Sequence, residues 1–216
     1  MQRVALTDEM RYRNEPCQMV HNTRVSVFAE HIDRTPEQEG HMRRLRYQVA
    51  TSLDGYLAGK DDEFNWIDRD PDIDCHKLLE QFDTALIGGK RFLTLLQQHR
   101  CDTLRDLDLV VFSRTLRSVD YPAVSLVSGD PAENVKILKA KPGKDIWLFD
   151  GGELFNTLLK AELVDTLETA VVPILLGHGI PMLSSLTSRT ELTLRKHRLY
   201  PKSGIVLLEH TVSRGR

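Results

Sequence analysis

Short runs of β-branched and aliphatic residues alternate with amphipathic segments from Arg46 to the end of the chain. This alternation is typical of an α/β domain in which helices cover a sheet. The predicted strands span residues 47–51, 84–87, 109–112, 124–127, 146–149, 166–173, 191–199 and 204–211. The predicted helices span residues 74–81, 92–99 and 130–139, and a fourth begins after Gly151 and Gly152.

The last two predicted strands flank the segment Tyr200-Pro201-Lys202-Ser203, whose composition favours a turn. A hairpin pairs its strands antiparallel, whereas strand–helix–strand units pair theirs in parallel. We therefore predict an α/β fold with a mixed β-sheet flanked by helices and a C-terminal antiparallel hairpin.

The chain has 216 residues, enough for one well-buried core. Residues 1–41 are rich in Arg, Glu, Gln, Thr and Asn and lack a useful helical or strand period. We interpret them as a flexible N-terminal extension, and residues 42–216 as a single domain.

Composition argues against several classes of partner. A formal net charge of -2 and a pI near 6.4 disfavour binding to nucleic acid or to a membrane surface. The longest apolar run contains Pro173 and falls far short of the roughly 20 residues that a membrane-spanning helix needs. Three cysteines without a CxxC pair, together with the lack of a secretory pattern, predict a cytoplasmic protein. The histidines lack HExxH spacing, so no metal site is expected.

Two predicted strands end in paired glycines and run directly into helices. Glycine lets the backbone turn sharply and approach a ligand, and the helix that follows points unpaired N–H groups toward an anion. Paired glycines are also common in tight turns that bind nothing. The two segments are Gly88-Gly89-Lys90-Arg91 and Gly151-Gly152-Glu153-Leu154.

A third strand end carries Ser113, Arg114 and Thr115, which supply hydroxyls and a guanidinium. Together the three ends predict that the chain binds NADPH. Lys90, Arg91 and Arg114 could contact the ribose 2′-phosphate, where sites specific for NAD carry a carboxylate. The alternative for these cations is a solvated charged face.

Five short motifs, all in the same order, resemble the C-terminal reductase domain of the riboflavin-biosynthesis protein RibD, within the dihydrofolate reductase superfamily. They are Val49-Ala50-Thr51-Ser52-Leu53-Asp54-Gly55-Tyr56-Leu57-Ala58 with Trp66, Leu86-Ile87-Gly88-Gly89, Phe112-Ser113-Arg114-Thr115, Phe149-Asp150-Gly151-Gly152 and Pro173-Ile174-Leu175-Leu176-Gly177.

This resemblance implies a dihydrofolate-reductase-like sheet, NADPH held across the strand ends, and hydride transfer from the nicotinamide to a small bound molecule. It implies that Ala50 and Leu57 border the nicotinamide, and that Thr51, Ser52 and Asp54 face the substrate. Homodimers are usual among such proteins, so a homodimer is expected.

Asp54 is the first candidate for a polar substrate contact or proton donor, although Asp-Gly is also a favoured turn dipeptide. In dihydrofolate reductases the acid lies on the first helix instead, and the corresponding candidates here are Asp70, Asp72 and Asp74. Such a cluster is also typical of helix caps.

Trp66 could form a wall of the substrate pocket or belong to the core. His178 lies in a glycine loop near the expected substrate entrance, or is an ordinary polar loop residue. Both are candidate substrate-binding residues.

The bifunctional relatives carry a zinc deaminase domain with HxE and PCxxC motifs, and neither motif occurs here. Any activity is therefore expected to be that of a reductase alone. The leading expectation is an NADPH-dependent reductase similar to the 5-amino-6-(5-phosphoribosylamino)uracil reductases. The alternatives are a dihydrofolate or pterin reductase and a nucleotide-binding module of the same fold without catalysis.

Overall fold

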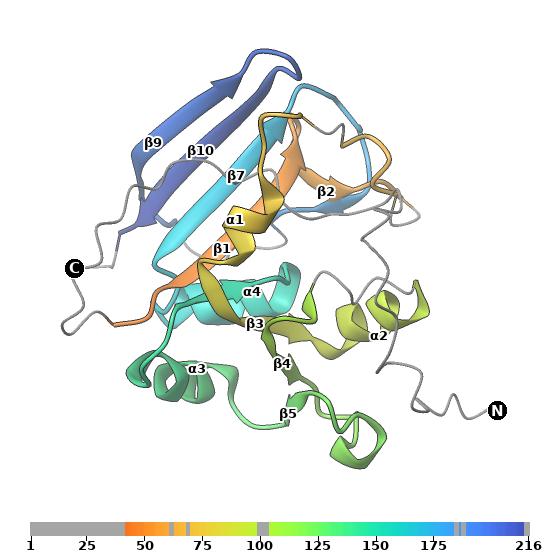
Figure 1. Ribbon diagram of the computed structural model, residues 1–216, viewed down its shortest axis with the longest axis vertical. Coiled ribbons are helices and arrows are strands. Elements are labelled where there is room, and N and C mark those ends of the chain that lie inside the picture. The colour runs from red at the N-terminus through yellow and green to blue at the C-terminus, as the bar shows by residue number, and fades with distance from the viewer. Residues whose placement is uncertain are drawn as a thin grey trace.

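The computed structural model describes residues 42–60, 63–67, 70–98, 104–183, 186 and 189–213. The predicted extension, residues 1–41, lies outside this part of the chain. Eight strands form one twisted sheet in the order β5-β4-β3-β6-β1-β7-β10-β9 (Figure 1). Their bounds are Leu45–Ser52 (β1), Phe82–Gly88 (β3), Asp108–Phe112 (β4), Ser125–Val127 (β5), Asp145–Leu148 (β6), Thr166–Val172 (β7), Leu192–Tyr200 (β9) and Ile205–Val212 (β10).

The sheet is mixed, as predicted. Neighbouring strands from β5 to β7 are all parallel, whereas β10 is antiparallel to both β7 and β9. The C-terminal hairpin turns at residues 201–204, one residue later than the predicted turn at 200–203. β1 lies between β6 and β7 in the interior of the sheet, and seven of its eight residues are buried, so both of its faces are covered.

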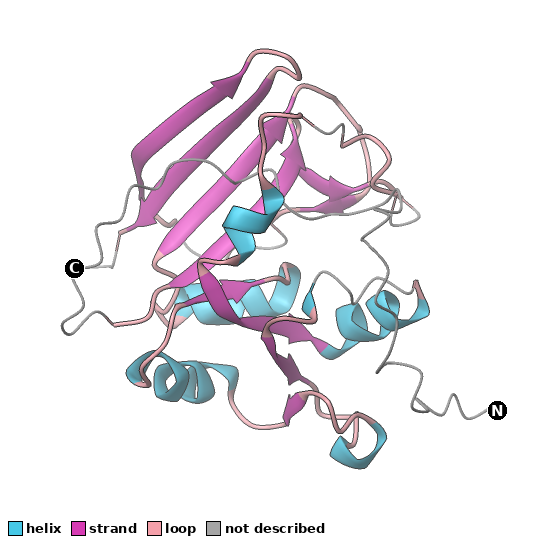
Figure 2. Cartoon of the chain, in the orientation of Figure 1, coloured by secondary structure: helices cyan, strands magenta, loops and turns pink. Residues whose placement is uncertain are grey.

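Helices cover the two faces of the parallel part of the sheet (Figure 2). Alternation along β3 shows the division, because Leu86 packs with α3 and α4 whereas its neighbour Ile87 packs with α1 and α2. No helix among the described residues is long and apolar enough to cross a membrane. The bounds are Cys75–Leu79 (α1), Gly89–Gln97 (α2), Pro131–Ala140 (α3) and Gly152–Lys160 (α4), with a short 3-10 helix at Ser118–Asp120.

A second, two-stranded sheet was not predicted. It pairs β2 (Tyr56–Ala58) with β8 (Ile180–Pro181) in antiparallel fashion. Gly179 has a φ of +143° and passes so close to the carbonyl of Ala58 that a side chain would collide with it. Strands of three and two residues carry too little periodicity to be predicted, and their pairing depends on how β1 and β7 place the loops that follow them.

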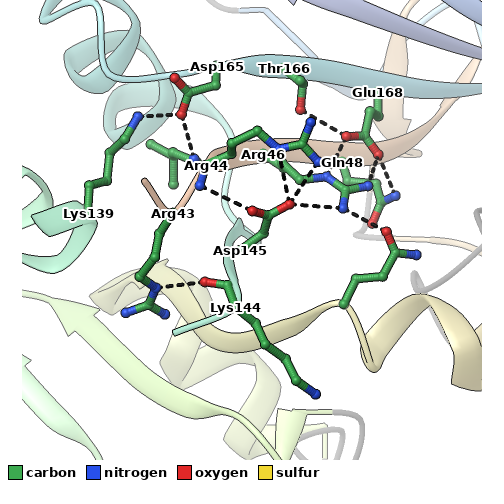
Figure 3. Close-up of polar contacts among 12 residues, drawn as sticks. Arg43, Arg44, Arg46, Gln48, Lys139, Lys144, Asp145, Asp165, Thr166 and Glu168 are labelled. Atoms are coloured by element: carbon green, nitrogen blue, oxygen red, sulfur yellow. Dashed lines mark hydrogen bonds and ion pairs between the residues drawn. The ribbon is translucent and has the colours of Figure 1, made fainter. Parts of the chain in front are cut away.

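A network of buried ion pairs crosses the amino-terminal half of the central strands (Figure 3). Arg46 is fully buried and contacts Glu168 through Nε at 2.6 Å and Asp145 through Nη1 at 3.4 Å. Lys139 of α3 pairs with Asp165, just before β7. Removing one member of such a network would leave an uncompensated buried charge, typically at a cost of about 3–5 kcal/mol.

Candidate functional site

Three predicted strand ends lie next to one another. Strands β4, β3 and β6 are adjacent and parallel, so their carboxyl ends meet at one edge of the sheet. The backbone N–H of Gly88 donates to Asp150 Oδ2 at 2.6 Å, joining the ends of β3 and β6. A Cβ on Gly89 would lie 2.8 Å from Ser113 Oγ, so the ends of β3 and β4 also touch. The two glycine pairs and the serine therefore converge in space.

The helices that follow the two glycine pairs begin differently from the others. Asp74 and Asp130 cap α1 and α3 with their carboxylates. Gly88 and Gly151 hold the same position before α2 and α4 and offer no side chain for capping. Because the first N–H groups of a helix have no intrahelical partner, α2 and α4 can direct theirs to a ligand.

The sheet opens between β1 and β6 at the same edge. Pairing of β1 with β6 stops at Tyr47↔Leu148, whereas pairing of β1 with β7 continues to Ser52↔Val172. The carboxyl half of β1 is therefore paired with a strand on its β7 side only. Parallel strands that separate in this way form a crevice, which is a usual ligand position in open α/β sheets.

A small pocket, partly open to solvent, lies in this crevice, and its inner space is about 30 Å³. Three predicted cofactor-binding residues, Ala50, Leu57 and Gly151, share it. A Cβ on Gly151 would lie 3.1 Å from the Tyr47 hydroxyl and 3.2 Å from Leu57 Cδ1, so a side chain there would narrow the pocket. The complete lining is Gln48, Val49, Ala50, Leu57, Trp147, Phe149 and Gly151.

The predicted cations differ in their surroundings. Lys90, in the first turn of α2, and Arg114, after β4, are both exposed. Arg91 is half-buried, and its guanidinium lies over the Phe64 ring at 5.4 Å from the centroid. Lys90 and Arg114 are therefore better placed than Arg91 to reach a ligand in solvent.

The remaining predicted cofactor-binding residues surround the same strand ends. Thr115 is exposed, and its backbone N–H donates to Ser113 Oγ at 3.3 Å. Gly152 has a φ of +65°, which favours glycine there. Glu153 is exposed in the first turn of α4, whereas the side chain of Leu154 is buried in the core. Only the backbone of Leu154 is thus available to a ligand.

Asp54 holds two loops together. Its carboxylate accepts hydrogen bonds from the Ser52 hydroxyl at 2.6 Å and from the backbone N–H groups of Gly177 at 2.7 Å and Leu176 at 3.1 Å. The Ser52 bond outweighs desolvation and, with the backbone bonds, holds the pKa of Asp54 below its ordinary value. These contacts favour the ionised form, and its catalytic role stays a prediction.

Thr51 and Ser52 are both buried. The Thr51 hydroxyl donates to the Ser52 carbonyl at 3.0 Å, and Ser52 Oγ also accepts the N–H of Tyr56 at 2.9 Å. Neither residue lines the pocket, and these hydrogen bonds organise the turn after β1. Their predicted contact with substrate remains untested.

The three candidate aspartates before α1 each have a structural partner. Asp70 is buried and accepts the N–H of Ser203 at 3.1 Å, and bonds from the Ser203 side chain and neighbouring backbone hold its pKa below the ordinary value. Asp72 pairs with Lys202, and Asp74 caps α1. The cluster thus attaches the segment before α1 to the turn between β9 and β10.

Trp66 and His178 do not line the pocket. Trp66 is half-buried against the core, and its indole N–H donates to the Glu63 carbonyl at 3.0 Å. His178 is exposed in the loop between β7 and β8. The pocket has a different tryptophan, Trp147, whose indole N–H donates to the Gln48 carbonyl at 3.3 Å.

Sequence reasoning missed Asp150, Gln48 and Trp147 as site residues. Asp150 lies directly before the glycine pair Gly151-Gly152, and this position could have indicated that it belongs to the site. Gln48 is a polar residue between Tyr47 and Val49 in a predicted strand, a position that indicates a buried polar contact. Trp147 lies within an apolar run, and nothing local distinguishes it from a core residue.

Comparison with known proteins shows the family of this chain. A sequence profile of the RibD C-terminal domain matches residues 43–206. The chain belongs to the RibD C-terminal domain family. The uncharacterized protein YyaP of Bacillus subtilis (strain 168) is 33% identical over 179 residues, covering 78% of this chain and 95% of YyaP.

Solved structures of RibD-related proteins share the fold. A protein of Shewanella sp. PV-4, provisionally assigned to riboflavin biosynthesis, superposes with a TM-score of 0.68 and 26% identity, covering 80% of this chain and all of its own. The diaminohydroxyphosphoribosylaminopyrimidine deaminase/5-amino-6-(5-phosphoribosylamino)uracil reductase of Thermotoga maritima gives 0.59 at 14% identity. That match covers 80% of this chain and 57% of the bifunctional protein. The predicted family and fold are therefore confirmed.

Proposed function

We propose that this RibD-family chain is an NADPH-dependent reductase of a small heterocyclic metabolite. The observation that carries the proposal is the convergence of three strand ends beside a crevice in the sheet. A dinucleotide needs both features, because its phosphates require N–H groups and cations whereas its nicotinamide requires an apolar slot.

The residues present fit the phosphate-bearing part of NADPH. Gly88 and Gly89 have almost no room for a side chain, because Asp150 and Ser113 pack directly against them and so bring the three strand ends together at the start of α2. Lys90 and Arg114 supply exposed positive charge on the two neighbouring strand ends. The Asp150 carboxylate would repel a phosphate. We therefore expect hydroxyl or amide groups of a ligand, and not its phosphates, to lie next to Asp150.

The crevice fits the other end of the cofactor. Bound NADPH would supply a hydride at this end. Ala50, Leu57 and Gly151 would hold a planar ring, since their small or aliphatic side chains leave a slot between β1 and the end of β6. Trp147 and Phe149 would exclude water from the ring and restrict its position relative to the substrate.

The substrate follows the family expectation, a ribosylaminouracil or a related pterin-like ring. For proton supply, Asp54 remains the predicted residue, although its depressed pKa disfavours direct donation near neutral pH. A cytoplasmic location and a homodimer remain predictions from the sequence.

The test is NADPH oxidation by the purified full-length chain. We expect loss of NADPH absorbance with at least one member of a panel of dihydrofolate, dihydropterins and 5-amino-6-ribosylaminouracils. Binding of NADPH measured by calorimetry, without turnover of any substrate, would favour the nucleotide-binding module. Failure to bind either NADPH or NADH would contradict the proposal.

A further inference from the structure

Gln48 connects the buried ion-pair network to the pocket. It is only 3% exposed and lines the pocket beside Ala50 and Trp147. Its Nε2 donates to Glu168 Oε2 at 2.8 Å (Figure 3). Its Oε1 is buried and has no hydrogen-bond partner within the part of the chain that the structure describes.

The neighbours of Gln48 determine the orientation of its side-chain amide. Glu168 accepts from Arg46 on both oxygens, at 2.6 and 2.7 Å, and from the Thr166 hydroxyl at 2.8 Å. Burial alone would lower the pKa of Arg46, but Glu168, and then Asp145, raise it above the ordinary value, so this cation is permanent. A carboxylate held by a cation only accepts hydrogen bonds, so the amide nitrogen must face it.

The amide oxygen is therefore the atom of the Gln48 side chain that has no hydrogen-bond partner among the described residues. Its backbone carbonyl already accepts the indole N–H of Trp147. A buried acceptor without a donor is costly, and a site of this kind discriminates strongly between ligands that provide the donor and ligands that do not.

We propose that Gln48 Oε1 accepts a hydrogen bond from an N–H group on a planar ring bound in the pocket. The inference rests on the proposed function, because it assumes that the pocket receives a heteroaromatic ring. A carbonyl or carboxylate at the same place on the ligand would be repelled by the amide oxygen. The N–H can come from an amino or lactam group of the substrate or from the carboxamide of the nicotinamide.

The experiment compares Gln48→Met with Gln81→Met in the full-length chain. Gln81 accepts from the same Arg46 at 2.8 Å but does not line the pocket, so it controls for damage to the network. The probes are NADPH, 2,4-diaminopyrimidine and 2,4-dimethylpyrimidine, whose methyl groups match the amino groups in size. We expect Gln48→Met to weaken NADPH or the diamino probe by about 10-fold or more, and Gln81→Met to change neither appreciably.

The two sources of the N–H give different results. Weaker binding of NADPH alone assigns the bond to the cofactor carboxamide, whereas weaker binding of the diamino probe alone assigns it to the substrate. Unchanged binding of both probes by folded Gln48→Met overturns the inference. If wild-type protein binds the diamino probe but no NADPH, the proposed function fails while the role of Gln48 is still tested.

A second arm uses ligand changes in place of a mutation and so does not depend on the variant folding. Wild-type protein is titrated with NADPH and with its 3-acetylpyridine analogue, which lacks the carboxamide N–H, and with the diamino and dimethyl pyrimidines. We expect at least one N–H-bearing ligand to bind about 10-fold more tightly than its partner. Equal affinity within both pairs would refute the proposal.

Discussion

The backbone N–H of Gly88 donates to the carboxylate of Asp150, 62 residues away, at 2.6 Å. This bond joins the carboxyl ends of β3 and β6 at the point where the two glycine pairs meet. It therefore fixes the geometry on which the proposed cofactor site depends.

Asp150→Ala should lower the free energy of unfolding by about 1–2 kcal/mol, because a hydrogen bond to a half-buried carboxylate is lost. Asp150→Asn keeps an acceptor and should lose about half as much. Urea denaturation at neutral pH measures both. Asp106→Ala is the matched control, since that side chain is 90% exposed. An effect of Asp150→Ala no larger than that of the control would show that the bond contributes little.

Gly89→Ala should weaken NADPH binding by about 10-fold, because the new Cβ would lie 2.8 Å from the Ser113 side chain at the mouth of the site. Gly129→Ala is the control, since its Cβ would have only Asn134 nearby, at 3.5 Å. Isothermal titration calorimetry gives both affinities. If the two variants bind NADPH equally well, the close contact with Ser113 does not shape the site.

The double variant Lys90→Ala, Arg114→Ala should weaken NADPH at least 10-fold more than NADH, because the two cofactors differ only in the 2′-phosphate. The double variant Arg117→Ala, Lys136→Ala removes two exposed cations that already pair with Asp120 and Glu133. This control should affect neither cofactor. Equal losses for NADPH and NADH in the test variant would refute the assignment of the 2′-phosphate to these residues.

Asp54→Asn should make the free energy of unfolding depend less on pH at acidic pH. The pKa of Asp54 is depressed in the folded chain, so its stabilisation is complete above the ordinary value of 3.8 and is lost as pH falls through the folded pKa. Wild type should therefore lose more stability than the variant between pH 7 and about pH 3. Urea midpoints at several pH values measure this. Parallel curves for the two proteins would mean that the bonds to Leu176 and Gly177 do not stabilise the ionised form.

The local chemistry of the sequence predicted much of the fold. The apolar runs of β3, β4 and β6, and the glycines after two of them, are recognisable in any surrounding, because they reflect burial on both faces and a sharp turn at the end. The helix 92–99 was predicted to start three residues later than α2 does, since Gly89 and Lys90 carry no apolar periodicity.

The chemistry inside the crevice was not predictable in the same way. Gln48 and Trp147 meet only because β1 and β6 pair as far as Tyr47↔Leu148 and then separate. Register is a property of the assembled sheet, and no short stretch of sequence encodes it alone. The same holds for Asp70, whose partner Ser203 is 133 residues away in the sequence.

The glycines that begin α2 and α4 also affect the energetics of the folded chain. Asp74 and Asp130 stabilise their helices with side-chain caps, each worth roughly a few tenths of a kcal/mol more than a glycine at the same position, and the two glycine-capped helices lack this contribution. Their first turns should fray and exchange amide hydrogens faster than the start of α3. An anion bound at the first turns of α2 and α4 would slow that exchange, because it would accept hydrogen bonds from their free N–H groups. Ligand binding would thus stabilise the two turns that lack a side-chain cap.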